Sequence, residues 1–162
     1  MPNSQLAGKQ VVLAVTGSIA AYKAIGLLRL LTQSGATVHV VMTESSTQFV
    51  APLTFEVLSG LPVTCDLFSG HQDMKHLSLT KQADLLLVAP CTSNTLAKLA
   101  LGLADNVLGT MALTVQCPLV ICPAMDGEMW SHPTVQAHAE TLRNRGAIII
   151  EPEIGELASG QW

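Results

Sequence analysis

Aromatic and charged residues are scarce in this chain of 162 residues. Aromatic side chains make up 4% of the sequence and charged ones 12%, whereas 49% of the residues are hydrophobic. A disordered chain needs the opposite balance, so this composition excludes intrinsic disorder. The length suffices for one domain with a sizeable core and is too short for two ordinary domains. We therefore expect residues 1–162 to form a single domain.

Basic clusters and long apolar runs are also missing. The chain has 8 Lys and Arg residues against 12 Asp and Glu, which gives a net charge of −4, and no stretch gathers the basic side chains. This argues against nucleic acids and anionic membranes as partners. No apolar run reaches the roughly 18–20 residues of a membrane span, and residues 1–10 lack the apolar core of a signal peptide. The sequence thus predicts a cytoplasmic protein.

The cysteines follow no spacing that is typical of metal or redox sites. There are four of them, and no two form a C-x-x-C pair; they are Cys65, Cys91, Cys117 and Cys122. Such a pattern in a chain without a signal peptide favours free thiols in a reducing compartment. We expect neither a disulfide framework nor a metal site.

Short apolar segments alternate with helix-like segments along the whole chain. The apolar segments predict strands at residues 10–16, 37–42, 83–89, 118–122 and 147–150. The other segments predict helices at residues 19–33, 95–103, 106–115 and 132–145. Residues 43–59 have a helical tendency, and Pro52 suits the start of a second helix there. Continuous apolar strands between helices are typical of a parallel sheet that is buried on both faces. The sequence therefore predicts an α/β fold with an open, doubly wound parallel sheet in three αβα layers.

Polar residues follow four of the predicted strands, at the edge where open α/β sheets bind ligands. Gly17 and Ser18 follow the first strand and open a helix, whose backbone N–H groups suit a phosphate. Neither a G-x-G-x-x-G fingerprint nor a P-loop is present, so the pattern favours one phosphomonoester over a dinucleotide or a nucleoside triphosphate. An ordinary helix cap by Ser18 explains the same residues about equally well.

The other strand ends offer further polar groups. Residues 43–46 could add hydroxyl donors to the same phosphate or cap a helix, and residues 91–95 could bond a ribityl chain or form an ordinary loop. His76, just ahead of a predicted short helix, could be a general base, although a lone histidine is more often a surface residue. Residues 123–130, with two Met and one Trp, could cover a flat ligand or pack into the core.

Together these segments resemble the homo-oligomeric flavin-containing cysteine decarboxylase family. The resemblance extends from residue 6 to residue 160, and its most specific motifs are residues 90–95 and 123–130. Further matching segments are residues 15–23, 42–50, 76–79 and 83–108. Within the family, the chain is most similar to the branch that acts on 4′-phosphopantothenoylcysteine in coenzyme A biosynthesis. The resemblance implies a Rossmann-like flavoprotein fold.

The resemblance also implies FMN as the cofactor and a role for each matching position. Phosphate contacts are implied for Gly17, Ser18, Ile19, Thr43, Ser45 and Ser46. Contacts to the rest of the flavin are implied for Thr92, Ser93, Asn94, Thr95 and Ala124. His76 matches the catalytic histidine, and Ser159 occupies the position of a catalytic cysteine. Asp126 and Met129 match substrate-binding positions, and residues 151–162 match a flap over the substrate.

The implied reaction has two halves and a small-molecule substrate, 4′-phosphopantothenoylcysteine. Flavin oxidises the cysteinyl side chain to a thioaldehyde, which lets the adjacent carboxylate leave as carbon dioxide. The resulting enethiol is then reduced to 4′-phosphopantetheine while a cysteine supplies a proton. Related enzymes that act on the C-terminal cysteine of a peptide stop at the enethiol. The resemblance implies a homo-oligomer, a trimer or a dodecamer, with FMN at the subunit boundary.

Two positions depart from the family pattern. Asp126 replaces an asparagine that resembles an anchor for the substrate carboxylate, and two such charges repel each other by up to ~4 kcal/mol at ~4 Å. Ser159 replaces the cysteine, and a hydroxyl is a far poorer acid than a thiol, whose pKa is about 8.5. Two alternatives therefore stay open: a peptidyl-cysteine decarboxylase that yields an enethiol, and a flavin-binding protein with impaired catalysis.

Overall fold

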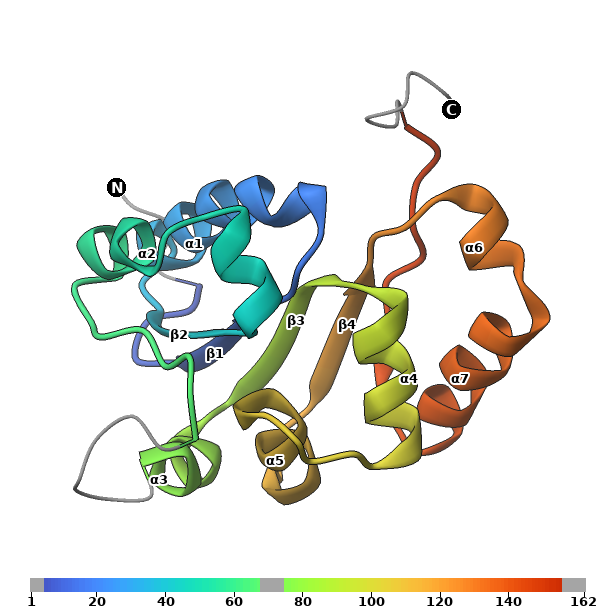
Figure 1. Ribbon diagram of the computed structural model, residues 1–162. Helices are drawn as coiled ribbons and strands as arrows, with labels where there is room; N and C mark the ends of the chain where they lie inside the picture. The colour runs from blue at the N-terminus through green and yellow to red at the C-terminus, as the bar shows by residue number, and fades with distance from the viewer. Residues whose placement is uncertain (1–4, 68–74, 156–162) are drawn as a thin grey trace.

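The computed structural model describes residues 5–67 and 75–155. Its sheet has five parallel strands in the order β2-β1-β3-β4-β5 (Figure 1). The strands are β1 (Gln10–Val15), β2 (Thr37–Met42), β3 (Leu85–Cys91), β4 (Leu119–Pro123) and β5 (Ile148–Ile149). In the register of the sheet, Val12 of β1 lies between His39 of β2 and Leu86 of β3. The predicted open parallel sheet is confirmed.

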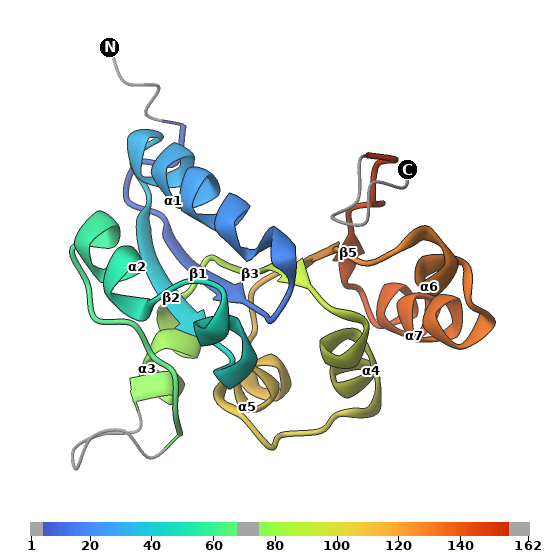
Figure 2. The same cartoon turned by 45° about the horizontal axis from the view of Figure 1, so that its top comes forward.

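Helices cover both faces of this sheet and make three layers (Figure 2). One face carries α1 (Lys23–Gln33) and α2 (Pro52–Ser59). The other face carries α3 (Lys75–Gln82), α4 (Ser93–Leu101), α5 (Val107–Thr114) and α7 (Pro133–Asn144). Two 3-10 helices, η1 (Ile19–Tyr22) and η2 (Glu44–Gln48), follow β1 and β2, and α6 (Gly127–Ser131) follows β4. None of the helices in the described ranges is long and apolar enough to cross a membrane.

The core consists of two apolar clusters, one on each face of the sheet. Successive side chains of a strand point to opposite faces, so β1 contributes to both clusters. Val11 and Leu13 pack with Leu28 of α1 and Phe55 of α2. Val12 packs on the other face with buried side chains of α4, α5 and α7. Because both faces are buried, β1 has the continuous apolar sequence from which it was predicted.

Several elements differ from their predicted bounds. Residues 43–59 contain η2 and α2, and α2 begins at Pro52 as expected, because a missing N–H costs no hydrogen bond in the first turn of a helix. β5 has two residues instead of four, as is common for an edge strand that pairs on one side only. α6 was not predicted, since five residues are too few to show a helical period. His76 lies inside α3, which begins one residue earlier than the histidine.

Gly109 in α5 provides a test of this packing. A Cβ at this position would lie 2.3 Å from the carbonyl oxygen of Leu103 and 3.2 Å from the Cα of Ala104. Backbone atoms cannot move away as a flexible side chain can, so Gly109→Ala should lower the free energy of unfolding by about 1–3 kcal/mol. Urea denaturation measures this loss. Gly155→Ala is the matched control, because nothing lies within 4 Å of its added Cβ; equal losses in both variants would contradict the prediction.

Candidate functional site

The strand order places a topological switch point between β1 and β3. From β1 the chain crosses through α1 to β2 on one side, and it later returns to β3 on the other side of β1. Open α/β sheets bind their ligands beyond the carboxyl ends of the strands at such a point. The loops that follow β1 and β3 therefore define the candidate site.

Buried Thr16 connects these two loops. Its hydroxyl donates a hydrogen bond to the carbonyl oxygen of Pro90 at 2.7 Å and accepts one from the backbone N–H of Thr92 at 3.0 Å. Thr92 is the N-cap of α4, and its hydroxyl accepts a hydrogen bond from the backbone N–H of Thr95 at 3.2 Å. The sequence places Thr16 in the polar segment 16–18 at the end of a strand, but no local pattern indicates its contacts with Pro90 and Thr92.

Gly17 lies against the loop that follows β2. A Cβ on Gly17 would lie 2.3 Å from the Oγ of Ser45 and 2.6 Å from its Cβ, so this approach requires glycine. The Oγ of Ser45 lies 3.2 Å from the Oγ1 of Thr43, whose backbone N–H donates to the carbonyl of Val15 at 3.1 Å. The structure thus brings together a glycine and two hydroxyl groups that the sequence assigned to one phosphate.

Two of the predicted phosphate ligands use their hydroxyls within the loops. The Oγ of Ser18 accepts a hydrogen bond from the N–H of Ala20 at 3.1 Å, which is the ordinary cap considered from the sequence. A hydroxyl that accepts can still donate to a ligand. Ser46 is fully buried, and its hydroxyl donates to the carbonyl of Thr43 at 2.7 Å. Ser46 therefore supports the turn, whereas Ser45 is exposed.

The loops after β3 and β4 adjoin each other. The backbone N–H of Ala124 donates to the carbonyl of Cys91 at 2.9 Å, which places the end of β4 beside the end of β3. In the first turn of α4, Asn94 is exposed and Ser93 is partly buried, whereas Thr95 is buried. Asn94 and Ser93 are thus more accessible than Thr95 among the predicted flavin contacts.

The predicted substrate-binding residues lie on α6. Asp126 is the N-cap of this helix, but its exposed carboxylate makes no capping hydrogen bond. Met129 is also exposed, and α6 packs against α7. Within the described ranges, no hydrogen bond joins either side chain to the loops after β1 and β3. The structure places an unpaired carboxylate and a thioether on the segment after β4.

The structure does not describe the side chains of the two predicted catalytic residues. Ser159 lies outside the described residues, and so does the side chain of His76. The backbone of His76 lies in the first turn of α3, which packs mainly against α5. α3 leads to Asp84, whose N–H donates to the carbonyl of Gln10 at the amino end of β1. Within one chain, the C-terminal end of α3 therefore lies near the amino ends of the strands, whereas Gly17 lies at their carboxyl ends.

The four cysteines lie in or near the core. All four are free thiols. Burial raises the pKa of the Cys91 thiol, which is fully enclosed, and it also raises the pKa of Cys65, Cys117 and Cys122. Protonated thiols are poor nucleophiles and poor metal ligands. Over residues 5–67 and 75–155, no group of three or more His, Cys, Asp or Glu side chains could hold a metal ion.

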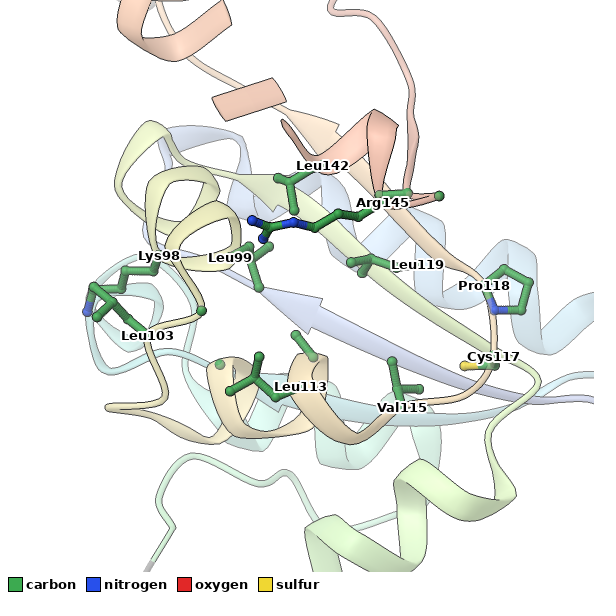
Figure 3. Close-up of a pocket in the computed structure, with 15 residues that line it drawn as sticks. Lys98, Leu99, Leu103, Leu113, Val115, Cys117, Pro118, Leu119, Leu142 and Arg145 are labelled. Carbon is green, nitrogen blue, oxygen red and sulfur yellow. The ribbon is translucent and has the colours of Figure 1, made fainter. Parts of the chain in front are cut away.

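A cavity of about 250 Å³ lies near the amino end of β4 (Figure 3). Its lining comes from α4, α5, the C-terminal end of α7 and the start of β4, and it includes Leu99, Leu113, Leu119 and Arg145. None of the predicted site residues lines this cavity. Its position near the amino end of β4 separates it from the switch point, so it is not the candidate site.

Comparisons with known proteins show the family of this chain and its fold. The model of the Flavoprotein family matches residues 1–161. The coenzyme A biosynthesis bifunctional protein CoaBC of Mycobacterium tuberculosis is 47% identical over 149 residues, which cover 92% of this chain and 36% of that protein. CoaBC of Bacillus subtilis is 43% identical over 157 residues, which cover 96% of this chain and 39% of that protein. The chain thus spans less than two fifths of the length of these relatives.

Two solved structures have the same fold. The FMN-dependent cysteine decarboxylase SpaF is 34% identical, with a TM-score of 0.87 over 93% of this chain and 87% of its own. A cysteine-to-serine mutant of PPC decarboxylase, complexed with pantothenoylaminoethenethiol, is 35% identical, with a TM-score of 0.82 over 94% of this chain and 87% of its own. The family model spans nearly the whole sequence, and these identities exceed 30%. The chain therefore belongs to the flavoprotein family.

Proposed function

We propose that this chain is an FMN-dependent decarboxylase of 4′-phosphopantothenoylcysteine, on the route to 4′-phosphopantetheine in cytoplasmic coenzyme A biosynthesis. The observation that carries the proposal is the meeting of the loops after β1, β2 and β3 at the switch point. Relatives named as coenzyme A biosynthesis proteins and a solved PPC decarboxylase support the choice of reaction. An FMN has one phosphate, which agrees with the single phosphate site expected from the sequence.

The residues at the switch point fit FMN. Gly17 leaves a space that a Cβ would fill, and Thr43 and Ser45 offer hydroxyl donors beside it for the phosphate. Ser93 and Asn94 offer a hydroxyl and an amide for the ribityl chain and the edge of the ring. Flavodoxin, whose sheet has this strand order, binds FMN at the switch point between β1 and β3.

The chain's own residues divide the proposed reaction into two steps. Bound FMN would supply the acceptor of a hydride equivalent from the cysteinyl side chain and the donor for a later reduction. His76 would accept a proton from the substrate as general base in the first step. Ser159 would have to donate a proton in the second step, for which its hydroxyl is a poor acid. Cys91 cannot replace it, because this thiol is buried and burial raises its pKa.

Substrate binding depends on the charge of Asp126. An ionised carboxylate accepts hydrogen bonds and cannot donate one to the carboxylate of the substrate. Asp126 is exposed, so water screens the repulsion and weakens its effect. We therefore expect a raised KM rather than a complete loss of binding.

A peptidyl-cysteine decarboxylase is the second candidate. Ser159 favours it, because a reaction that ends at the enethiol needs no proton donor for a reductive step. The similarity to SpaF, named as an FMN-dependent cysteine decarboxylase, is compatible with it. The two candidates share the cofactor and the first step, and they differ in the substrate and the product.

We also propose that the active unit is a homo-oligomer, a trimer or a dodecamer, with FMN at the boundary between subunits. The side chains of Ile19, Tyr22 and Leu30 on η1 and α1 are each more than half exposed, next to the loop of Gly17. An apolar surface of this kind is typical of an interaction site. The position of α3 supports the same arrangement, because His76 would reach the cofactor site from a neighbouring subunit.

Gly17→Ala should weaken FMN binding. The added Cβ would meet the Oγ of Ser45 at 2.3 Å and push the β2 loop away from the phosphate. We expect the unmodified protein to release FMN, not FAD, on acid denaturation. Fluorescence titration should show at least a tenfold weaker affinity for FMN in the variant, about 1.4 kcal/mol.

The control is the double variant Gly17→Ala, Ser45→Gly, which removes the Ser45 Oγ and Cβ atoms that the new Cβ meets. It should recover part of the lost affinity. Unchanged affinity in Gly17→Ala would contradict the phosphate site. Unmodified protein that released FAD or refused FMN would contradict the cofactor itself.

Ser159→Cys should change the product formed from 4′-phosphopantothenoylcysteine. In air, we expect the unmodified protein to accumulate the enethiol, seen by mass spectrometry as loss of carbon dioxide and two hydrogens. The added thiol should raise the share of 4′-phosphopantetheine, which has lost carbon dioxide alone, at least tenfold, because general acid catalysis contributes about 10²–10⁴-fold. Asp126→Asn should lower KM in both backgrounds.

Ser34→Cys, at the C-terminal end of α1, is the control for an added thiol and should leave the product ratio unchanged. Rapid formation of 4′-phosphopantetheine by the unmodified protein, at roughly 1–10³ per second, would show that Ser159 is an adequate acid. Turnover of a peptide with a C-terminal cysteine, without turnover of the pantothenoyl substrate, would favour the second candidate.

Mixing two inactive variants should restore activity if the site lies between subunits. At low FMN concentration, Gly17→Ala should bind no FMN. His76→Asn lacks the general base but should still bind FMN. Subunit exchange would create sites that combine an intact Gly17 with an intact His76 from different chains. Each variant refolded alone serves as the control, and decarboxylation is followed by carbon dioxide release. A mass of 17.1 kDa by light scattering with FMN bound, or no recovery on mixing, would refute the shared site.

A further inference from the structure

We propose that Thr16 is a positioning residue, which holds the loop after β3 in the shape that binds the flavin. The inference rests on the proposed function, since it names what sets the shape of the cofactor site. The hydroxyl of Thr16 donates to the carbonyl of Pro90 at 2.7 Å and accepts from the N–H of Thr92 at 3.0 Å. Thr16 is fully buried, so it acts through Thr92 and does not touch the ligand.

These contacts occur where the regular pairing of the sheet has ended. The register between β1 and β3 runs from the pair Val11 and Leu85 to the pair Ala14 and Val88. Beyond Val88, β3 also shifts its register against β4. Past this point, the segments that follow β1 and β3 are joined by the hydroxyl of Thr16 and by its backbone N–H. This N–H donates to the carbonyl of Pro90 at 3.3 Å. At the switch point, hydrogen bonds from a side chain therefore replace the backbone hydrogen bonds that pair the strands.

The influence of Thr16 extends into the first turn of α4. Thr92 receives its position from Thr16 and caps the helix through its own hydroxyl, which accepts from the N–H of Thr95. Ser93 and Asn94 are the accessible groups proposed to contact the flavin, and they lie between Thr92 and Thr95 in the sequence. Without the hydroxyl of Thr16, the N–H of Thr92 would lose its acceptor in a partly buried place, which is unfavourable. The loop would then relax and change the direction of Ser93 and Asn94.

The test compares Thr16→Val with Thr16→Ser. Valine has nearly the same shape and removes both side-chain hydrogen bonds, whereas serine keeps the hydroxyl. We expect Thr16→Val to raise the dissociation constant for FMN at least tenfold and to alter the visible circular dichroism of the bound flavin. Thr16→Ser should stay within about threefold of the unmodified protein and keep its spectrum. Val38→Ala, which opens a cavity in buried β2, should lower Tm and leave both readouts unchanged.

Equal FMN affinity in Thr16→Val and the unmodified protein would overturn the inference, and so would equal losses in the valine and serine variants. A lower Tm in Thr16→Val with an unchanged dissociation constant would also overturn it, by showing a purely structural role. If Thr16→Val does not fold, Thr16→Cys, with its weakly bonding thiol, replaces it with the same expected outcomes. If the unmodified protein binds no FMN, the proposed function fails. Hydrogen exchange at the N–H of Thr92 then tests Thr16 separately, with faster exchange expected in the valine variant.

Discussion

Burial of both faces of the sheet is the constraint on which the rest of this structure depends. Alternate residues of β1 enter two different apolar clusters, so the interior of the sheet has no room for unpaired polar side chains. Buried Thr16 and Ser46 lie just beyond the ends of β1 and β2, where the backbone leaves the ladder and needs other hydrogen-bond partners. The position of the candidate site therefore follows from the way the core is built.

The hydrogen bonds at the switch point show how this confinement produces a binding surface. Thr16, Thr92 and Ser46 direct their hydroxyls to backbone groups of the loops. Ser45 and Asn94 remain exposed on the same loops. The loops thus contain two kinds of polar residue, those that fix the backbone and those that remain accessible to a ligand. Both kinds look alike in a sequence.

The difference between polar residues that fix the backbone and polar residues that remain accessible explains how much the sequence could predict. The strands and their order of appearance follow from apolar runs, and the segments of the site follow from their places after those strands. The bonds of Thr16 join residues that are 74 and 76 positions away, and a local pattern carries no information about such contacts. The burial of Ser46 and the short helix α6 escaped prediction for related reasons, since both depend on the packing around them.

In the proposed site, cofactor binding and chemistry would be carried by different parts of the chain. The groups proposed to hold FMN lie on loops that buried hydrogen bonds fix to the sheet. His76 lies on α3, which packs against α5, and Asp126 lies on α6, which packs against α7. A substitution on α3 or α6 can therefore alter the reaction without disturbing the loops that hold the cofactor. In the proposed reaction Asp126 affects substrate binding, and within the described ranges its side chain makes no hydrogen bond to the loops at the switch point, so the residue at this position can differ without altering those loops.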